Sequence, residues 1–275
     1  MKFTKMHGIG NDYIYVNGMS EDVCYDREYI QKISDRHTGV GSDGMIVILA
    51  SEHCDFKMRM FNKDGSEGKM CGNGIRCFAK FVYDHGLTNK ERITVETLGG
   101  NKIVYLDIVN GEVLSAKVDM GEPIFECSRI PVALECAQMI DAPLTINHVT
   151  YQVTCLSMGN PHCVIFVNDV MGMNLDKIGP YFEYSLYFPE SVNTEFVELI
   201  DEETIKMRVW ERGSKETQAC GTGACASAVA AMLLSNRKRK ITVQLLGGDL
   251  DIEWAKDNHV YMSGPAVSVY QGEID

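Results

Sequence analysis

Short runs of alternating apolar and polar residues recur along the whole chain and predict a fold with many strands. The runs are rich in β-branched and aromatic residues and end at Gly, Pro, Asn or Asp, which is typical of strands. In the first half they lie at residues 14–16, 45–49, 56–61, 93–97, 102–108 and 113–119. In the second half they lie at residues 150–156, 163–167, 195–199, 204–210, 241–245, 250–254 and 259–262. Strands this numerous beside a few helices predict an α+β fold.

Two predicted helices begin directly after a Cys-Gly motif. In the first, apolar residues recur at helical spacing before Gly86, which provides a stop. These positions are Ile75, Phe78, Ala79 and Val82. In the second, residues 224–234 are apolar almost all round, which is typical of a helix wrapped by a sheet. Two further helices are expected at residues 27–37 and 175–183, although a Gly-Pro pair interrupts the second.

The chain also repeats itself, and a repeat constrains the architecture. CGNG at residues 71–74 recurs as CGTG at residues 220–223, an offset of 149 residues. Four more places match at this offset or one residue less: Gly10-Asn11 with Gly159-Asn160, Phe61-Asn62 with Trp210-Glu211, Gly65-Ser66 with Gly213-Ser214, and Leu98–Gly100 with Leu246–Gly248. Five matches in one order indicate a duplicated domain.

The boundary between the two halves is expected at MGEP, residues 120–123, because Gly and Pro interrupt the strand pattern there. A second Gly-Pro pair at residues 264–265 indicates another crossing near the end of the chain. We therefore expect an N-terminal domain of residues 1–119 plus about 266–275, which carries Cys71. The C-terminal domain would comprise residues 120–265 and carry Cys220.

Charge and apolar content exclude several classes of partner. The 26 Lys and Arg residues against 38 Asp and Glu give a net charge of −12, which repels nucleic-acid phosphates and anionic lipid surfaces. The longest nearly apolar run, residues 224–234, is much shorter than the ~20 residues of a membrane span. The N-terminus reaches Asn and Asp too early for the apolar region of a signal peptide. A cytoplasmic protein without nucleic-acid or membrane partners is expected.

The 10 cysteines are too sparse for a disulfide scaffold and favour a reducing compartment. Neither Cys71 and Cys77 nor Cys220 and Cys225 have the CxxC spacing of structural zinc, so no metal site is expected. Most free cysteines in proteins are small buried hydrophobic residues. We expect that role for Cys24, Cys54, Cys127, Cys136, Cys155 and Cys163, and for Cys77 and Cys225 within their helices.

Cys71 and Cys220 are different, because each precedes a glycine-containing turn that opens a helix. The unsatisfied N–H groups and positive dipole end of a helix N-terminus favour an anion, either a carboxylate ligand or a thiolate. The same field lowers the pKa of a cysteine from about 8.5. Both residues are therefore candidate reactive thiols.

Two such thiols from duplicated halves are expected to face each other across a shared cleft. A substrate carbon between them could lose a proton to one thiol and gain one from the other, which inverts a stereocentre. Backbone N–H groups at the two helix starts could hold an α-carboxylate and stabilise the carbanion. These groups belong to Gly72, Asn73, Gly221 and Thr222. Because no lysine lies in a recognisable pyridoxal-phosphate context and no nucleotide motif occurs, a cofactor-independent racemase or epimerase is the resulting hypothesis.

Several motifs together resemble the diaminopimelate epimerase family nearly end to end. They are HGIGNDY at 7–13, FNKDGSEGKMCGNGIRC at 61–77, GNPH at 159–162, VNTEF at 192–196, WERG at 210–213 and ACGTGACA at 219–226. The resemblance implies conversion of LL-2,6-diaminopimelate to the meso form, in lysine and peptidoglycan-precursor synthesis, without a cofactor. It also implies two pseudo-symmetric domains, each a mixed, mostly antiparallel sheet rolled around a central helix, and a homodimer.

The resemblance also assigns roles to individual residues. Cys71 resembles the proton acceptor and Cys220 the proton donor. Gly72-Asn73 and Gly221-Thr222 resemble the residues that hold the substrate carboxylate in the family. The other substrate-holding residues of the family correspond here to Asn11, Asn62, Asn160, Asn193, Glu211 and Arg212. His162 and Glu211 resemble a polar pair that supports the thiols and the reacting ammonium. Gly44 departs from the family, in which many members have a substrate-contacting Gln.

Three alternatives stay open from the sequence. A proline racemase-like enzyme or a phenazine-type isomerase would be another cofactor-independent isomerase of the same superfamily. Both thiols, the WERG segment and the asparagines argue against it, because a small imino acid offers no distal carboxylate for Arg212. A noncatalytic binder of anionic amino acids would need the helix N-termini but neither thiol. In that case, replacement of Cys71 would leave ligand affinity unchanged.

Overall fold

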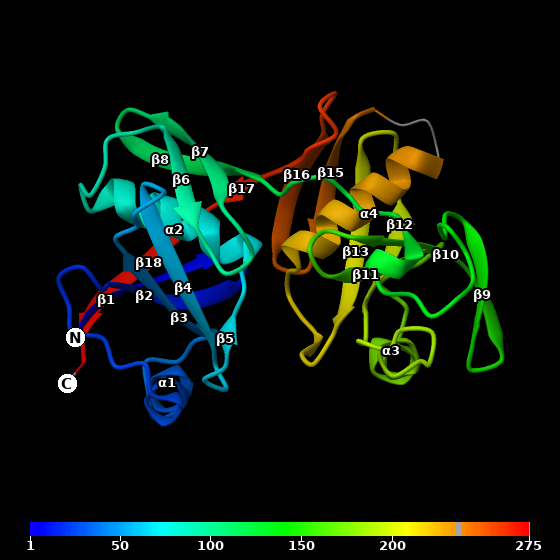
Figure 1. Cartoon of the computed structure of the whole chain (residues 1–275), viewed down its shortest axis with the longest axis horizontal. Coiled ribbons are helices and arrows are strands. Elements are labelled where there is room, and N and C mark those ends of the chain that lie inside the picture. The colour runs from blue at the N-terminus through cyan, green and yellow to red at the C-terminus, as the bar shows by residue number, and fades with distance from the viewer. Residues whose placement is uncertain (235–237, 275) are drawn as a thin grey trace. The chain divides into compact units, whose positions relative to one another are not determined.

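A computed structural model describes residues 1–234 and 238–274 of the chain (Figure 1). The described chain divides into two compact units. The first unit comprises Met1–Asp119 and Ser263–Asp275, of which Asp275 lies outside the described residues. The second unit comprises Met120–Met262.

The first unit is a mixed sheet with two helices. Its strands are β1 (Lys2–Gly8), β2 (Asn11–Asn17), β3 (Gly44–Leu49), β4 (Phe56–Asn62), β5 (Glu67–Gly68), β6 (Arg92–Glu96), β7 (Lys102–Val109), β8 (Glu112–Asp119) and β18 (Val267–Glu273). Neighbours pair in the order β18-β1-β2-β3-β4-β6-β7-β8. The β2–β3 and β4–β6 pairs are parallel and the others are antiparallel.

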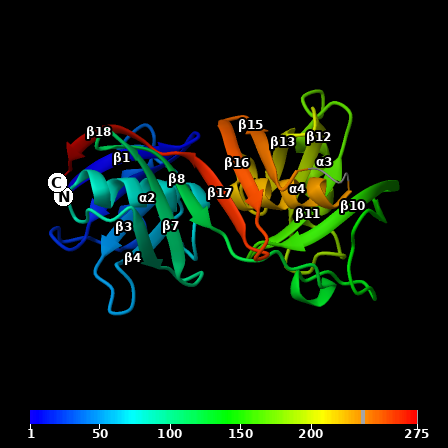
Figure 2. The same ribbon diagram turned by 90° about the horizontal axis from the view of Figure 1, so that it is seen from above.

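The sheet of the first unit wraps around α2 (Gly72–Asp84), as Figures 1 and 2 show. This helix contacts β1, β2 and β3 as well as β7 and β8, which lie toward opposite ends of the strand order. The helix ends where predicted, because Gly86 adopts a positive φ of 67° and Leu87 N–H bonds the carbonyl of Val82. The other helix, α1 (Arg27–Ser34), packs against β3.

The second unit repeats this plan. Its strands are β9 (Ala142–Ile146), β10 (Val149–Ser157), β11 (Pro161–Phe166), β12 (Asn193–Leu199), β13 (Thr204–Glu211), β14 (Lys215–Glu216), β15 (Lys240–Leu245) and β16 (Gly248–Trp254), while β17 (Val260–Pro265) contains the residue boundary between the units. Its helices are the 3₁₀ turn η1 (Cys127–Arg129), α3 (Leu175–Glu183) and α4 (Gly221–Leu234).

Strand pairing in the second unit matches that of the first unit step by step. The pairs β10–β11, β12–β13 and β15–β16 are antiparallel, whereas β11–β12 and β13–β15 are parallel. α4 contacts all six of these strands, and 11 of its 14 residues are buried. The predicted α+β class, with two duplicated sheets that each surround a central helix, is confirmed.

Some predicted boundaries were wrong for local reasons. The first helix ends at Ser34 rather than at residue 37, because the Asp35 side chain accepts the N–H groups of His37 and Thr38 and turns the chain. α3 continues through Pro180 despite the Gly-Pro pair. Strands β1 and β18 were not predicted. Both carry charged or exposed residues in place of a clean alternation.

Candidate functional site

Cys71 occupies the N-cap position of α2 in the first unit. Its backbone is extended, and its Sγ accepts a hydrogen bond from the backbone N–H of Gly74 at 3.2 Å. The thiol also donates to Oδ1 of Asn11 at 3.2 Å. Asn11 is the first residue of β2, so the start of a strand and the start of the central helix meet at this sulfur. The half-buried thiol lies at the positive end of the helix dipole, as the sequence predicted.

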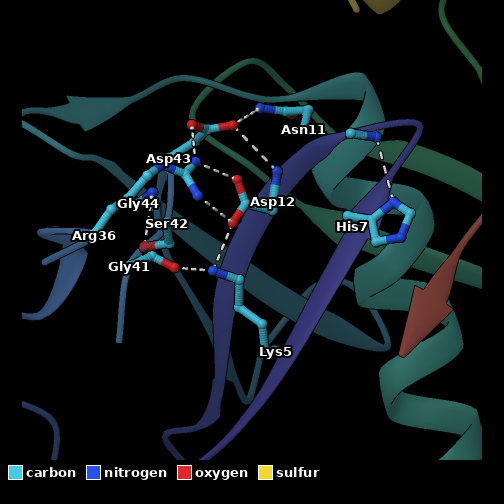
Figure 3. Close-up of polar contacts among 10 residues, drawn as sticks. Lys5, His7, Asn11, Asp12, Arg36, Gly41, Ser42, Asp43 and Gly44 are labelled. Atoms are coloured by element: carbon cyan, nitrogen blue, oxygen red, sulfur yellow. Dashed lines mark hydrogen bonds and ion pairs between the residues drawn. The ribbon is translucent and has the colours of Figure 1, made fainter. Parts of the chain in front are cut away.

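A network of charged residues fixes the orientation of Asn11 (Figure 3). Asn11 Nδ2 donates to Oδ2 of Asp43 at 2.9 Å, and Asp43 Oδ1 accepts from Arg36 at 2.9 Å. A carboxylate only accepts hydrogen bonds, so it selects the amide nitrogen of Asn11 and leaves the amide oxygen toward the sulfur. The sequence reasoning missed Asp43. Its position in the GVGSDG segment, just before the start of β3, was the available signal.

Asp12 anchors the same network from the adjoining position of β2. It pairs with Arg36 at 2.6 Å and with Lys5 at 2.5 Å, and Lys5 also donates to the carbonyl of Gly41. Burial raises the pKa of Asp12, but the hydrogen bonds from Arg36 and Lys5 outweigh it and lower the pKa below its ordinary value. Asp12 is therefore held ionised, which keeps Arg36 beside Asp43.

Cys220 precedes α4 in the second unit and has different surroundings. Its Sγ accepts from the backbone N–H of Gly223 at 3.4 Å and lies 3.6 Å from Oγ1 of Thr222. Burial, followed by the negative charges of Glu211 and Glu195, raises the pKa of Cys220 well above its ordinary value. The sequence-based expectation of a lowered pKa was wrong for this residue. Desolvation and two carboxylates outweigh the helix field, so Cys220 is held as a thiol.

A fully buried histidine lies among these groups. His162 Nδ1 is 2.7 Å from Oε1 of Glu195, and its Nε2 is 2.9 Å from Oδ1 of Asn160. At the offset of 149 residues, His162 corresponds to Tyr13 and Glu195 to Ile46, so this acid–base pair belongs to the second unit alone. Glu195 was missed, although it lies in the VNTEF segment. The available signal was a carboxylate within a predicted strand, which needs a partner such as a histidine if it is buried.

Glu211, at the end of β13, accepts a hydrogen bond from Oγ1 of Thr217. Burial raises the pKa of Glu211, although hydrogen bonds from Thr217 and Cys220 oppose the shift. Glu211 therefore lies within hydrogen-bond reach of Cys220. The other residue of the predicted polar pair, His162, has Glu195 and Asn160 as its hydrogen-bond partners.

The turn that carries Arg212 is braced on both sides. Oδ1 of Asn193 accepts the backbone N–H of Arg212 at 2.9 Å, and its Nδ2 donates to the carbonyl of Pro161 at 3.0 Å. The exposed Arg212 side chain donates through Nη1 to the carbonyl of Glu190 at 2.8 Å, which leaves most of its N–H groups for a ligand. Asn193 therefore positions Arg212 through the backbone.

Glu183 braces the same turn and was not among the residues predicted from the sequence. This buried residue ends α3 and accepts the indole N–H of Trp210 at 2.7 Å and the backbone N–H of Gly213 at 2.8 Å. Its two carboxylate oxygens thus hold the residues on either side of Glu211 and Arg212. No sequence motif indicates this role, since Glu183 lies 27 residues before Trp210.

We expect Glu183→Gln to weaken both this brace and the stability of the second unit. An amide has one acceptor oxygen, so one of the two N–H groups would face an NH₂ group and lose its partner. Chemical denaturation should show a free energy of unfolding that is lower by about 1–3 kcal/mol. Glu190→Gln is the control, because Glu190 is exposed and its backbone carbonyl, which the substitution keeps, is the group that accepts from Arg212. Equal stability of the two variants would contradict the bracing role.

The remaining predicted residues lie at the starts of the two central helices and at the end of a strand. Gly72 and Asn73 open α2, Gly221 and Thr222 open α4, and Asn62 ends β4. The first N–H groups of a helix have no acceptor within it, so both helix starts can bind a carboxylate. Asn62 Nδ2 donates to Oγ of Ser66 at 3.0 Å.

Gly44 opens β3 with a positive φ of 150°. A Cβ atom there would lie 1.9 Å from the carbonyl oxygen of Phe61, so this backbone excludes any side chain. We expect Gly44→Ala to destabilise the first unit by about 2 kcal/mol or more, measured by chemical denaturation. Gly111→Ala is the matched control, since Gly111 also has a positive φ but has open space around it. A Gly44→Ala variant as stable as the control would contradict this.

Among the described residues, no group of three His, Cys, Asp or Glu side chains could hold a metal ion. No helix of residues 1–234 and 238–274 has both the length and the apolar character to span a membrane.

Comparison with known proteins identifies the relatives of the chain. The family model described as diaminopimelate epimerase matches residues 3–126 and 154–269. A diaminopimelate epimerase of Methanococcus maripaludis is 56% identical over 276 residues, which cover 100% of both chains. One of Acetivibrio thermocellus is also 56% identical, with 100% of this chain and 99% of the relative covered.

Two solved structures that share this fold have low sequence identity to the chain. A probable proline racemase from Agrobacterium radiobacter has a TM-score of 0.72 and 11% identity, with 100% of this chain and 92% of that chain covered. A phenazine biosynthesis protein from Bacillus anthracis has a TM-score of 0.71 and 18% identity, with 100% and 98% covered. At these identities the likeness concerns the fold alone.

Proposed function

Because the chain belongs to the diaminopimelate epimerase family, we propose that it interconverts LL- and meso-2,6-diaminopimelate with Cys71 and Cys220 as its two acid–base groups. The enzyme is an isomerase and acts in lysine and peptidoglycan-precursor synthesis. The observation that carries the proposal is the different environment of two cysteines in equivalent positions. Cys71 caps its helix beside a neutral amide, while buried carboxylates hold Cys220 as a thiol.

This difference supports a direction for each proton transfer. In the LL-to-meso direction, the Cys71 thiolate takes the α-proton and leaves the electron pair on the α-carbon. The Cys220 thiol then gives its proton to the opposite face of that carbon. The products are the inverted centre, a Cys71 thiol and a Cys220 thiolate, so the roles are reversed for the meso-to-LL direction. Proton transfer from a positioned group contributes about 10²–10⁴-fold to a rate.

The helix starts supply the stabilisation that a weak carbon acid requires. Backbone N–H groups of Gly72, Asn73, Gly221 and Thr222 are proposed to bind the α-carboxylate, where negative charge accumulates as the proton leaves. The distal carboxylate of the substrate is assigned to Arg212, whose guanidinium can bind it through two hydrogen bonds. A proline racemase-like reaction leaves Arg212 without a role, and a noncatalytic binder leaves both thiols without one.

The asparagines complete the proposed site. Asn11 and Asn160 lie beside Cys71 and His162, respectively, and are proposed to hold the reacting end of the substrate. Asn62 is proposed to contact the distal end, and Asn193 acts there by positioning Arg212. Glu211 and His162 are proposed to support the Cys220 thiol and the substrate ammonium.

The direct test is proton NMR of LL-diaminopimelate incubated with reduced enzyme in heavy water, without added cofactor. We expect the α-proton signal to disappear as meso product forms, because the proton added at inversion comes from a thiol that exchanges with solvent. L-Proline, treated in the same way, is the control substrate and should keep its α-proton. Folded, reduced enzyme that exchanges proline but not diaminopimelate would contradict the proposal.

We further propose a cytoplasmic homodimer that binds neither nucleic acid nor membranes. The net charge of −12 supports the absence of polyanionic partners. The homodimer rests on the resemblance to the family, and light scattering coupled to size exclusion measures it directly.

A further inference from the structure

Two cysteines outside the proposed active site have their sulfur atoms in contact. Cys127 opens η1 in the second unit, and Cys136 lies in the loop that precedes β9. Their Sγ atoms are 2.8 Å apart. A disulfide bond holds sulfur atoms at about 2.0–2.1 Å, so bond formation requires a further approach of less than about 1 Å.

The backbone around the pair holds the two residues together independently of their side chains. Cys127 N–H donates to the carbonyl of Ala137 at 3.0 Å, and residues Glu126 and Gln138 form an antiparallel bridge. The loop between them is tied back to its start, because Val132 N–H donates to the carbonyl of Cys127 at 2.7 Å. The sulfur contact is thus built into the course of the chain.

The two thiols differ in access to solvent. Cys136 is exposed, as is Cys24, which corrects the expected role of both as small buried residues, whereas Cys127 is 1% exposed. A second pair, Cys155 and Cys163, lies on adjacent positions of β10 and β11 and is fully buried. A reagent in solution therefore reaches the first pair through Cys136 and does not reach the second pair in the folded chain.

We propose that Cys127 and Cys136 form a reversible intramolecular disulfide when the chain meets a low-molecular-weight disulfide. The Cys136 thiolate attacks one sulfur of the small disulfide, forms a mixed disulfide and displaces one small thiolate. Cys127 then loses its proton to solvent and attacks Sγ of Cys136, which displaces the second small thiolate. The protein dithiol is oxidised by two electrons, and one small disulfide is reduced to two thiols.

The bond would fasten the loop onto the hydrophobic core of the second unit. Cys127, Ile130, Val132 and Met139 belong to this core, together with Phe182 and Trp210. Trp210 is the residue that Glu183 holds at the start of the Arg212 turn. Closing the loop restricts the unfolded chain, so oxidation stabilises this unit without a change in the residues proposed for catalysis.

The test uses the full chain and oxidised glutathione as the small disulfide. After incubation under native conditions, remaining thiols are alkylated and peptides are mapped by mass spectrometry. We expect a bond between Cys127 and Cys136, with Cys155 and Cys163 alkylated only after unfolding. Thermal unfolding of the second unit should shift upward by about 5 °C in the oxidised chain and return on reduction.

Three variants make the result specific. Cys136→Ser should abolish both the bond and the thermal shift, whereas Cys24→Ser, which removes another exposed thiol, should preserve both. Cys127→Ala should accumulate glutathione on Cys136, because the thiol that displaces it is missing. Stable glutathione on Cys136 in the unmodified chain, or a bond from Cys136 to a second molecule, would overturn the proposal.

Discussion

Replacement of Cys71 or Cys220 by Ala is expected to lower the rate of diaminopimelate epimerisation by about 10³-fold or more, because each variant lacks one of the two proton-transfer groups. The measurement is kcat in both directions by chiral chromatography of substrate and product. Cys54→Ala is the matched control, since Cys54 is partly exposed and lies outside both helix starts. Both catalytic variants should still unfold cooperatively, with a loss of about 0.5–2 kcal/mol because each cysteine accepts a backbone N–H at its helix start.

The two variants should differ in the exchange of substrate protons with solvent. Cys220→Ala retains the group proposed to act on the LL isomer, so it should exchange the α-proton of LL-diaminopimelate for deuterium without inversion. Cys71→Ala should instead act slowly on the D-centre of the meso isomer, because Cys220 is held as a thiol. The opposite pattern would mean that the two proton transfers are assigned to the wrong residues.

The raised pKa of Cys220 also determines how the rate depends on pH. In the LL-to-meso direction Cys220 must carry a proton, and burial with Glu211 and Glu195 keeps it protonated well above the ordinary pKa of a thiol. The rate in this direction should therefore not fall as the pH passes through about 8.5, where an ordinary cysteine would lose its proton.

The sequence was sufficient to predict the residues that the duplication places in equivalent positions. Cys71 and Cys220 were found by the same motif before a helix, and Asn11 and Asn160 by the common offset. The structure places both cysteines at helix starts, and this position could be predicted because a helix N-terminus creates its electrostatic field locally, from a few consecutive residues. The alternation of strands and the two central helices follow from equally local patterns.

The residues that the sequence did not reveal act through contacts between distant segments. Asp43 reaches Asn11 from 32 residues away, and Glu195 reaches His162 from 33 residues away. The pKa of Cys220 is reversed by burial and by carboxylates that the chain brings together only when folded. Local patterns give the position of a thiol, but its protonation depends on the tertiary environment.

Arg212→Met is expected to raise KM for diaminopimelate by about 10²-fold, with a smaller effect on kcat. Methionine keeps much of the side-chain volume but removes the charge-assisted hydrogen bonds to the distal carboxylate. The turn itself should persist, because Asn193 and Glu183 hold it through backbone N–H groups and the Trp210 indole. The loss should therefore appear in binding, and the variant should unfold like the unmodified chain.

A substrate analogue can show whether Arg212→Met removes only the contact with the distal carboxylate or disturbs the whole binding site. An analogue that lacks this carboxylate should bind the unmodified enzyme and Arg212→Met equally weakly, since neither complex contains the ion pair. Arg129→Met is the control, because Arg129 is an exposed arginine of the same unit that forms a 3.6 Å ion pair with the exposed Glu126. If Arg212→Met leaves KM for diaminopimelate unchanged, the distal carboxylate is bound elsewhere, and the specificity for a diamino diacid over a small imino acid requires another residue.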